Sequence, residues 1–305
     1  MTKLRTFTVS TRFLVISDTH DFKYNEESGP FRGSTDKVDV VLHCGDLTQV
    51  GGSSEYKRAL KMLASIPAEL RLVIAGNHDL SLDADYWKTV DADEQEGEKE
   101  DHAEAVDIMT GNLAKAAGVT YLTEGVHNFT LKSGARFTVY ASPYQPRFGD
   151  WAFHYERNED RFNPVGRAAL GTVSISRNPV PDSPGVDIMI THGPPMGLLD
   201  DSAHGHLGCS SLLHALQRCR PRMHCFGHIH EGYGAKMVSW KEEGEAGEVE
   251  TVYQKAVEKA NSYPASGYCP IDFRKETLLV NAAIMDGENK PTNDPWLVDL
   301  DLQRV

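Results

Sequence analysis

The chain has 305 residues, of which 31 are Lys or Arg and 44 are Asp or Glu, so its formal net charge is −13. An apolar fraction of 40% and a charged fraction of 25% are typical of a globular protein, and they exclude collagen-like, coiled-coil and wholly disordered chains. The acidic balance argues against a general binder of nucleic-acid polymers or membrane surfaces, because both carry negative charge.

No apolar stretch approaches the roughly 20 residues that span a bilayer, and the N-terminal segment has no apolar region followed by a small-residue cleavage site. The five cysteines fit neither CxxC nor zinc-knuckle spacing, and their odd number disfavours a disulfide framework. We therefore expect reduced thiols, most of them buried, in a cytoplasmic protein.

Short runs of β-branched and apolar residues predict buried strands that end in polar clusters. The clearest runs are 12–18, 39–44, 70–75 and 186–191. Helical patterns are predicted over 53–65, with serines as the N-cap, and over 208–219. Strands that alternate with helices favour an α/β protein built from right-handed βαβ units.

A different pattern, short strands joined by Gly-containing links, occupies the middle of the chain. It predicts an antiparallel meander of three strands over 120–122, 126–131 and 136–141, with Gly134 at a hairpin turn. A further strand is expected over 277–284.

Two segments are expected to be insertions into a single domain that spans residues 1–305. Residues 91–107 hold nine acidic residues and one lysine, a net charge of −8, which predicts a solvated, mobile and dispensable loop. A partner-binding acidic tract is the alternative. The second insertion, residues 239–274, is rich in Glu and Lys and then in Tyr, Pro and Gly.

Polar clusters stand directly after five predicted strands. They occupy residues 17–20, 45–46, 76–79, 191–193 and 227–230. Because the loops at the carboxyl ends of strands meet at one edge of an open α/β sheet, these clusters are expected to converge. The glycines before Asp46, Asn77 and His228 allow sharp turns and close backbone approach.

The clusters supply two Asp, one Asn and four His as candidate metal ligands, and no thiolate. Carboxylate and amide oxygens with imidazole nitrogens suit Mn²⁺, Fe, Zn²⁺, Co²⁺ or Ni²⁺ better than Ca²⁺ or a structural zinc ion. Asp18 and His20 are two residues apart on an extended chain, as are His228 and His230, so both side chains of each pair can lie on one side.

The order Asp-x-His, Gly-Asp, Gly-Asn-His-Asp, His and Gly-His-x-His resembles the calcineurin-like metallophosphoesterase superfamily. In more detail it is similar to the branch of metallophosphoesterase-domain-containing proteins described from animal brain, with fungal and bacterial relatives. The resemblance covers roughly residues 12–300 outside both insertions. It rests on residues 42–48, 73–79, 142–146, 190–195 and 226–234.

This resemblance implies a four-layer α/β/β/α sandwich with two divalent transition metal ions at one edge. The implied ligands are Asp18, His20, Asp46 and His230 for the first ion, and Asp46, Asn77, His192 and His228 for the second. Asp46 would bridge the two ions, and His78 would be a non-ligand histidine that faces the phosphate.

Two ions about 3.5–4 Å apart generate a bridging hydroxide nucleophile near neutral pH and offset the charge of a phosphoryl group in an in-line displacement. His78 would then stabilise the transition state or protonate the leaving oxygen. Asp79 either orients His78 or caps a helix. Tyr144 and Arg147, in an aromatic-rich loop with Trp151, are candidate substrate-binding residues, with packing of the loop as the alternative.

The remaining histidines carry weaker expectations. His43 is expected either to pack in the core or to support the metal ligands, and His224 shows no ligand pattern. His204 and His206 are expected to lie in a loop without a metal role.

These expectations define a metal-dependent hydrolase of phosphoric esters that favours small phosphodiesters, such as cyclic nucleotides. The alternatives are a phosphomonoesterase or protein phosphatase, and a metal-binding scaffold with little turnover. Phosphoprotein phosphatases of this superfamily carry an arginine after the bridging aspartate, whereas residues 45–51 contain none. The expected partner is a small phosphate ester, not a nucleic-acid polymer or a membrane, and the sequence does not identify a protein partner.

Overall fold

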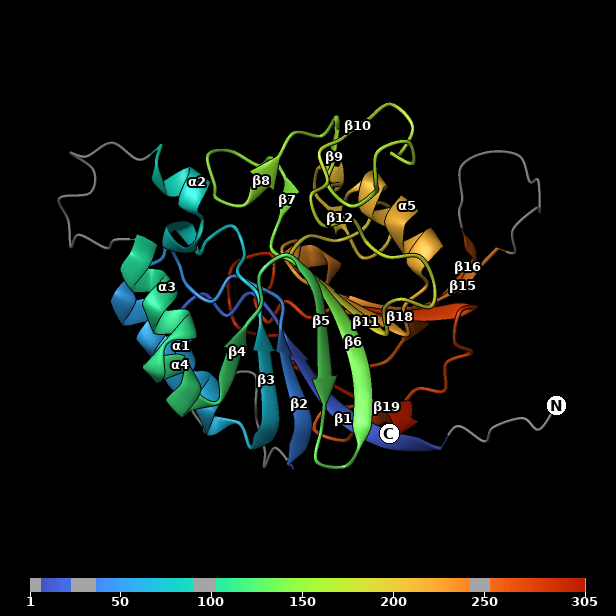
Figure 1. The fold of residues 1–305 in the computed structure, drawn as a ribbon, viewed down its shortest axis with the longest axis horizontal. Helices are drawn as coiled ribbons and strands as arrows, with labels where there is room; N and C mark the ends of the chain where they lie inside the picture. Colours follow the sequence, from blue (N-terminus) through green and yellow to red (C-terminus); the bar gives the residue numbers. More distant parts are fainter. Residues whose placement is uncertain (1–6, 23–36, 90–101, 242–252, 305) are drawn as a thin grey trace.

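The computed structural model describes residues 7–22, 37–89, 102–241 and 253–304. The first strands along the chain are β1 (Thr8–Ile16), β2 (Val38–His43), β3 (Ala68–Val73) and β4 (Val119–Tyr121). They are followed by β5 (Gly125–Thr130), β6 (Ala135–Ser142), β11 (Ile188–Thr191), β14 (Met223–Phe226), β15 (Gly234–Trp240), β16 (Tyr253–Lys259), β17 (Gly267–Tyr268), β18 (Glu276–Asn281) and β19 (Trp296–Arg304). Among the described residues these strands form one 13-stranded sheet, in which β17 and β5 pair with β19 and β6 beside the main path. The main path runs β16-β15-β18-β14-β11-β6-β19-β1-β2-β3-β4 (Figure 1).

Helices flank this sheet, and three pairs of short strands lie outside it. The helices are α1 (Ser53–Ser65), α2 (Ala84–Trp87), α3 (His102–Thr110), α4 (Asn112–Ala117) and α5 (Ser210–Cys219), with 3₁₀ turns η1 (Leu80–Leu82) and η3 (His230–Gly232). The short pairs are β7 (Gln145–Pro146) with β8 (His154–Tyr155), β9 (Glu159–Asp160) with β10 (Val173–Ser174), and β12 (Asp201–Ser202) with β13 (Gly205–His206).

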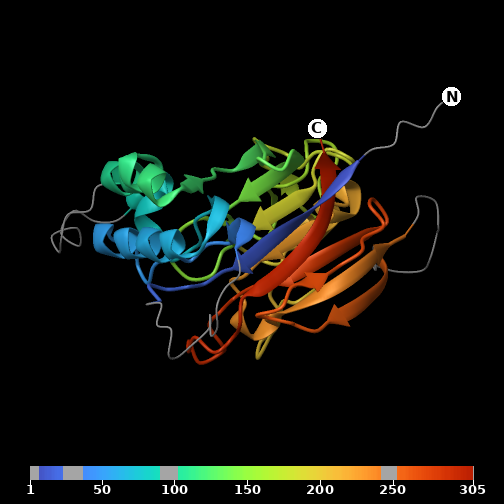
Figure 2. The ribbon, with the colours of Figure 1, turned by 90° about the horizontal axis from the view of Figure 1, so that it is seen from below.

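The sheet bends so that its two halves pack face to face, which produces four layers. The rings of Phe13 on β1 and Phe137 on β6 meet between the halves, with centroids 5.8 Å apart. Successive side chains of a strand point to opposite faces, so Leu14 instead packs with α1, α3 and α4. On the other half, Met189 of β11 packs with α5. The predicted α/β/β/α sandwich is confirmed (Figures 1 and 2).

The two predicted helices are present as α1 and α5, but the cap of the first differs from the prediction. The helix over 53–65 is α1, whose buried face includes Tyr56 and Leu63. Its N-cap is Gly52, without a side-chain capping bond, so the predicted serine cap is wrong. The hydroxyl of Ser53 instead bonds to Glu104 of α3 at 2.9 Å.

The predicted three-stranded meander is also wrong in part. β5 and β6 form the expected antiparallel hairpin, and Gly134 occupies its turn with a φ of 84°. However, β4 pairs in parallel with β3, not with β5. The reason is the segment between β3 and β4, in which α3 and α4 form the crossover that a parallel pair requires.

The first predicted insertion is partly an ordered helix. Residues 102–107 belong to α3, where Ala105, Ile108 and Met109 are buried against α1. These apolar residues at i, i+3 and i+4 form one helical face, and their burial outweighs the local charge. The prediction of a loop is therefore wrong for residues 102–107. Residues 91–101 lie outside the described residues.

The second predicted insertion also contributes to the sheet. Trp240 ends β15 and is buried, and β16 pairs with β15 along its length. Residues 242–252 lie outside the described residues. All five cysteines are free, and four of them are buried, as predicted. No helix in the described part of the chain has the length and apolar character needed to cross a membrane.

Candidate metal centre

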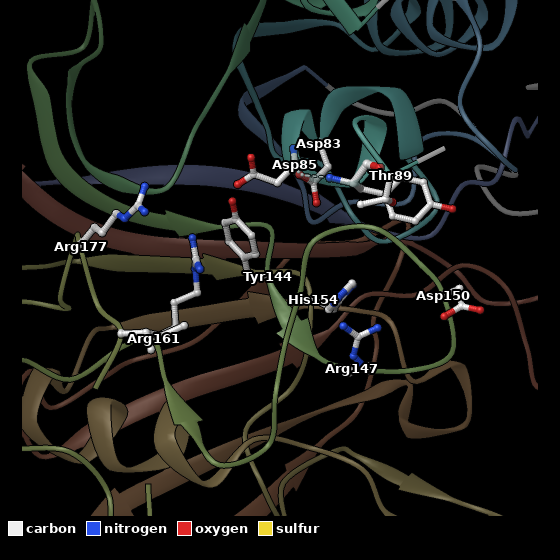
Figure 3. A pocket seen from close by; sticks show the side chains of 11 residues that line it. Asp83, Asp85, Thr89, Tyr144, Arg147, Asp150, His154, Arg161 and Arg177 are labelled. Carbon is white, nitrogen blue, oxygen red and sulfur yellow. Dashed lines mark hydrogen bonds between the residues drawn. The ribbon is translucent and has the colours of Figure 1, made fainter. Parts of the chain in front are cut away.

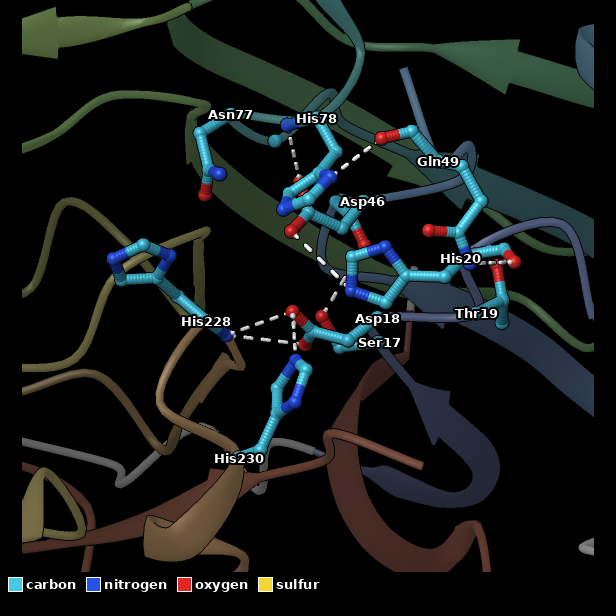
Figure 4. Close-up of polar contacts among 12 residues, drawn as sticks. Ser17, Asp18, Thr19, His20, Asp46, Gln49, Asn77, His78, His228 and His230 are labelled. Carbon is cyan, nitrogen blue, oxygen red and sulfur yellow. Dashed lines mark hydrogen bonds and ion pairs between the residues drawn. The ribbon is translucent and has the colours of Figure 1, made fainter. Parts of the chain in front are cut away.

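The five polar clusters lie at one edge of the sheet, directly beyond the carboxyl ends of β1, β2, β3, β11 and β14. Three groups of their ligand atoms each fall within 4.8 Å of one another. The first is Asp18 with His20 and His230, and the second is Asp46 with His192 and His228. The third, His20 with Asp46 and His78, connects the other two through His20 and Asp46. Figure 4 shows the imidazole rings of His20, His228 and His230 arranged around the carboxylates of Asp18 and Asp46.

Asp46 lies between the two groups. Its Oδ2 is 3.7 Å from Nε2 of His20, and its Oδ1 is 3.3 Å from Nε2 of His192. The same Nε2 of His192 is 2.8 Å from Oδ1 of Asn77. One carboxylate thus faces a ligand from each predicted set, which is the geometry that a bridging ligand requires.

Asp18 occupies the opposite side of the first group. Both of its carboxylate oxygens accept the backbone N–H of His228, at 3.1 and 3.0 Å. Its Oδ1 is also 3.4 Å from Nε2 of His230. The loops after β1 and β14, which are 210 residues apart in the chain, are therefore joined at this carboxylate.

The donor set fits two divalent transition metal ions. Asp18 is fully buried and Asp46 is 2% exposed, and no lysine or arginine among the described residues pairs with either of them. A buried carboxylate is costly unless a cation compensates its charge. Imidazole nitrogens and carboxylate or amide oxygens, without thiolates, are the ligands that such ions prefer.

The pKa shifts of Asp18 and Asp46 favour the ionised carboxylates. Burial alone would raise the pKa of Asp18, but its hydrogen bond to His230 and the charges of His230 and His192 lower it to about 2. Burial likewise opposes ionisation of Asp46, yet His192 holds its pKa well below the usual range. Both carboxylates are thus ionised at neutral pH, the form in which they bind metal.

Four of the seven predicted ligands adopt a left-handed backbone, which non-glycine residues rarely do. Their φ angles are 53° for Asp18, 43° for His20, 55° for Asp46 and 67° for His228. Such conformations cost free energy and cluster at functional sites. The sequence carries no direct signal of this strain.

The glycines of the clusters are explained by close approach to the ligands themselves. A Cβ atom on Gly227 would overlap the carboxylate of Asp18, and one on Gly76 would overlap Asp46. The predicted close approach is therefore to the ligand side chains, so these positions have no space for any larger residue.

His78 lies at the side of the first group, held on three sides. Its Nδ1 is 2.6 Å from the carbonyl oxygen of Gln49, and its ring stacks on Trp151 with centroids 3.9 Å apart. The ring of His20 lies nearly perpendicular to that of His78, with the two ring centroids 4.5 Å apart. Because a carbonyl only accepts, Nδ1 carries a proton, which leaves Nε2 as the nitrogen available to a ligand.

Asp79 does not have either of its predicted roles. Its carboxylate accepts the backbone N–H groups of Leu47, Thr48 and Gly76, at 3.2, 3.1 and 2.8 Å, and the hydroxyl of Thr48 at 2.8 Å. It makes no side-chain cap for η1, and the ring of His78 bonds to Gln49 instead. Asp79 thus joins the loops after β2 and β3. Burial and the charge of Asp46 raise its pKa to about 7.

The ligand groups open into a cavity of about 440 Å³ that has an apolar wall. Its lining residues are His20, Asp46, Gln49, Asn77, His78, Phe148, Trp151, His228, His230, Glu231, Met285, Gly287 and Asn289. The sequence interpretation missed Phe148, Glu231 and Met285. Met285 and Asn289 follow β18, which neighbours β14. Their place after the predicted strand over 277–284 was the signal that could have placed them at the site.

Tyr144 and Arg147 are not among the residues that line this cavity, and their substrate-binding role stays a prediction. They line a second cavity of about 670 Å³ (Figure 3), where the guanidinium carbon of Arg161 lies 3.3 Å from the ring centroid of Tyr144. The Nε of Arg147 is 2.5 Å from Glu156. The loop between β7 and β8 turns Phe148 and Trp151 toward the metal cavity and Arg147 away from it.

Two further histidines are fully buried behind the clusters. His43 Nε2 is 3.0 Å from the hydroxyl oxygen of Thr19, and His224 Nε2 is 2.8 Å from that of Thr191. Burial lowers the pKa of both imidazoles to about 3, so each ring is neutral at neutral pH. His206, in contrast, pairs with Asp200 in the loop of β12 and β13, at 2.9 Å.

The fold and the ligand groups are those expected for the calcineurin-like phosphoesterases. Residues 11–232 match the family model of the calcineurin-like phosphoesterases, and the chain belongs to this family. Members of the family use divalent metals, and the ligand groups described above are candidate sites for them.

Among curated proteins, the chain is 35% identical over 234 residues to the human metallophosphoesterase domain-containing protein 1, covering 73% of this chain and 62% of the relative. It is 32% identical to a probable rhamnogalacturonate lyase C of Emericella nidulans, over 75% of this chain but 18% of that protein. The chain thus spans less than two thirds of these relatives. Among solved structures, the protein TT1561 of Thermus thermophilus aligns with a TM-score of 0.39 and 12% identity, over 75% of this chain and 84% of that one.

Proposed function

We propose that the chain hydrolyses small phosphodiesters at a dinuclear metal centre. The observation that carries the proposal is the cavity itself: Asp46, a member of the second ligand group, also lies 3.7 Å from His20 of the first, and no lysine or arginine is among the described residues that line it. The first ion would be held by Asp18, His20, Asp46 and His230, and the second by Asp46, Asn77, His192 and His228.

Two divalent ions at these positions would lower the pKa of a water molecule and offset charge on the phosphoryl oxygens. The protein orients their ligands through its own hydrogen bonds. Nδ1 of His192 bonds to the carbonyl of Cys44 at 2.9 Å, and Nδ1 of His20 to that of Thr48 at 3.2 Å. These bonds leave each Nε2 as the ligand atom, as is usual for metal-binding histidines.

His78 would act on the leaving group. Its ring is fixed by the carbonyl of Gln49 and the face of Trp151, so Nε2 keeps one orientation beside the cavity. With the ring protonated on both nitrogens, Nε2 can donate a hydrogen bond or its proton to the oxygen that departs from phosphorus.

The charge of the cavity supports a diester as substrate. A monoester dianion carries more charge than a diester monoanion, and selective monoesterases add cationic side chains beside their metals. Here the described lining instead offers Phe148, Trp151 and Met285 as an apolar wall, which suits the second ester group of a diester. A cyclic nucleotide has both the diester and a flat apolar group that can stack on Phe148, whose side chain is 60% exposed.

The ion pair is proposed to be Mn²⁺ or a similar transition metal, because imidazole ligands bind such ions more tightly than Mg²⁺. Mn²⁺ should therefore activate the metal-free protein more than Mg²⁺ does. A cytoplasmic location is part of the proposal, since free thiols persist in a reducing compartment.

The test is a comparison of kcat/KM on two model esters at saturating Mn²⁺. We expect bis-p-nitrophenyl phosphate, or a 2′,3′-cyclic nucleotide, to exceed p-nitrophenyl phosphate by at least about tenfold, which is roughly 1.4 kcal/mol of transition-state discrimination. Equal or reversed values would identify a monoesterase instead. No turnover of any ester by the metal-replete protein would favour a metal-binding scaffold.

A further inference from the structure

The two buried histidines behind the metal centre occupy equivalent places in the two halves of the sheet. His43 is the last residue of β2, which pairs in parallel with β1. His224 lies on β14, which pairs in parallel with β11. Each ring reaches sideways to a threonine at the end of the neighbouring strand: Thr19 beyond β1, and Thr191 at the end of β11. The sequence offered a supporting role for His43 as one of two alternatives, and none for His224.

Each of these threonines directly precedes a candidate ligand. Thr19 is followed by His20, which belongs to the first ligand group, and Thr191 is followed by His192, which belongs to the second. The same arrangement of histidine, threonine and ligand histidine therefore occurs once for each proposed ion.

The direction of the hydrogen bonds follows from the groups that can only donate or only accept. The hydroxyl of Thr191 donates to the carbonyl oxygen of Gly193 at 2.7 Å, so it must accept the Nε2 proton of His224. The backbone N–H of Gly45 donates to Nδ1 of His43 at 3.3 Å. The proton of this neutral ring is therefore on Nε2, which donates to Thr19.

A threonine hydroxyl that accepts on one side and donates on the other is fixed in one rotamer. Thr191 has both partners, at 2.8 and 2.7 Å. Thr19 has His43 at 3.0 Å and the carbonyl of Leu47 at the longer distance of 3.5 Å. This support matters most next to His20, whose φ of 43° must be held against its intrinsic cost.

We propose that His43–Thr19 and His224–Thr191 are two independent positioning pairs, each of which fixes the ligand histidine of one metal ion. The inference rests on the proposed dinuclear centre but not on the proposed preference for diesters. All four residues act through the ligands, so their effect should appear in metal affinity before it appears in turnover.

The threonines are the better probes of this proposal. His43 also accepts the N–H of Gly45, beside the shared ligand Asp46, so its removal would disturb both ions. Replacement of threonine by valine keeps the shape and removes only the hydroxyl, whereas replacement by serine keeps the hydroxyl. The variants are Thr19→Val, Thr191→Val, the double Val variant, Thr19→Ser and Thr191→Ser.

Thr277 provides a matched control. It is a fully buried threonine on β18 that accepts the indole N–H of Trp240 at 2.8 Å and donates to the carbonyl of Pro221 at 2.6 Å. Thr277→Val therefore removes the same two kinds of hydrogen bond at a position that precedes no ligand. It should lower the melting temperature without changing metal affinity.

The experiment titrates the metal-free full chain with Mn²⁺ by calorimetry, with bound metal counted by elemental analysis and folding followed by melting temperature. We expect two ions per chain for the unaltered protein. Each single Val variant should lower the affinity for one ion by about 10- to 100-fold and change the affinity for the other by no more than about threefold. The double Val variant should weaken both ions, and each Ser variant should restore at least half of the lost affinity on a logarithmic scale.

Three results would overturn the proposal: Val variants that bind both ions as tightly as the unaltered protein, single variants that weaken the same ion, or a loss of affinity in Thr277→Val equal to theirs. Fewer than two ions on the unaltered protein would overturn the dinuclear centre and the positioning pairs together. Two tightly bound ions without diesterase activity would contradict the proposed function alone, and the pattern among the variants would still decide this inference.

Discussion

The two cavities on either side of the 147–154 loop differ in how their charges are compensated. In the larger one, Arg161 pairs with Glu124 and Arg147 pairs with Glu156, both within 2.8 Å. In the smaller one, two buried carboxylates, Asp18 and Asp46, face only imidazoles and backbone N–H groups among the described residues. Two arginines of the larger cavity thus have carboxylate partners, whereas the two carboxylates beside the smaller one are candidate metal ligands.

Backbone conformation separates the two cavities in the same way. Four residues of the metal centre have left-handed φ angles, and none of the described residues lining the larger cavity does. Strain of this kind persists only where the surrounding structure enforces it. Cavity size is therefore a poor guide to the candidate metal site here, and buried carboxylates together with backbone strain are a better one.

The largest expected effect comes from replacing the carboxylate of Asp46, compared with the same replacement of a buried carboxylate in the larger cavity. Asp46→Asn should reduce activity to the background rate and weaken binding of both ions, because the shared ligand loses its charge. Asp83→Asn is the matched control. Asp83 is also buried and lines the larger cavity, where its carboxylate accepts three backbone N–H groups. The control should keep its activity and its metal content within about threefold of the unaltered protein, as measured by steady-state kinetics and metal counts. Similar losses in both variants would show that the two cavities do not differ in this respect.

A smaller but still large effect is expected at His78. His78→Ala should lower kcat by roughly 10²- to 10⁴-fold while the protein keeps both ions, since His78 is assigned to the leaving group and not to a metal. Parallel measurement of kcat and metal content checks this separation. A loss of metal as severe as that of Asp46→Asn would show that His78 is a ligand.

Trp151 should have an intermediate effect, because it stacks on the ring of His78 and forms part of the apolar wall of the cavity. Trp151→Leu removes the stacking contact at 3.9 Å, which is worth about 0.5–1.5 kcal/mol, so kcat should fall about three- to tenfold. Trp151→Phe keeps a flat ring and should recover most of this loss. An unchanged kcat in Trp151→Leu would remove Trp151 from the positioning of His78.

The smallest effects are expected on the far side of the loop. Tyr144→Phe and Arg147→Ala should leave kcat/KM on a diester within about threefold, because both residues line the larger cavity. A tenfold or greater rise in KM for either variant would mean that the substrate extends from one cavity into the other.

The parts of the molecule that the sequence predicts well are those in which local pattern and tertiary structure agree. The strand runs and the two helices over 53–65 and 208–219 were found because apolar periodicity reports burial directly. The convergence of the five clusters followed from a general property of strand ends in α/β sheets. These two steps were enough to place Asp18, Asp46 and His192 near one another.

The errors arose where tertiary contacts decide the outcome. The charge of 91–107 concealed the buried face of Ala105 and Ile108, because helix packing depends on a partner that local composition does not reveal. The cavity that Tyr144 and Arg147 line is likewise set by the β7–β8 pairing, which spans too few residues to leave a pattern, and their substrate-binding role stays a prediction. The strained φ angles of the ligands are likewise set by the loops around them and not by residue type.

The central claim is that one edge of the sheet binds two metal ions and that Asp46 is a ligand of both. The most direct measurement is a crystal structure of the full chain grown with Mn²⁺, with an anomalous difference map recorded at the manganese edge. Two peaks should appear on either side of Asp46, one near Asp18, His20 and His230 and the other near Asn77, His192 and His228. A single peak there, or manganese bound only by Asp200, Asp201 and His206, would contradict it.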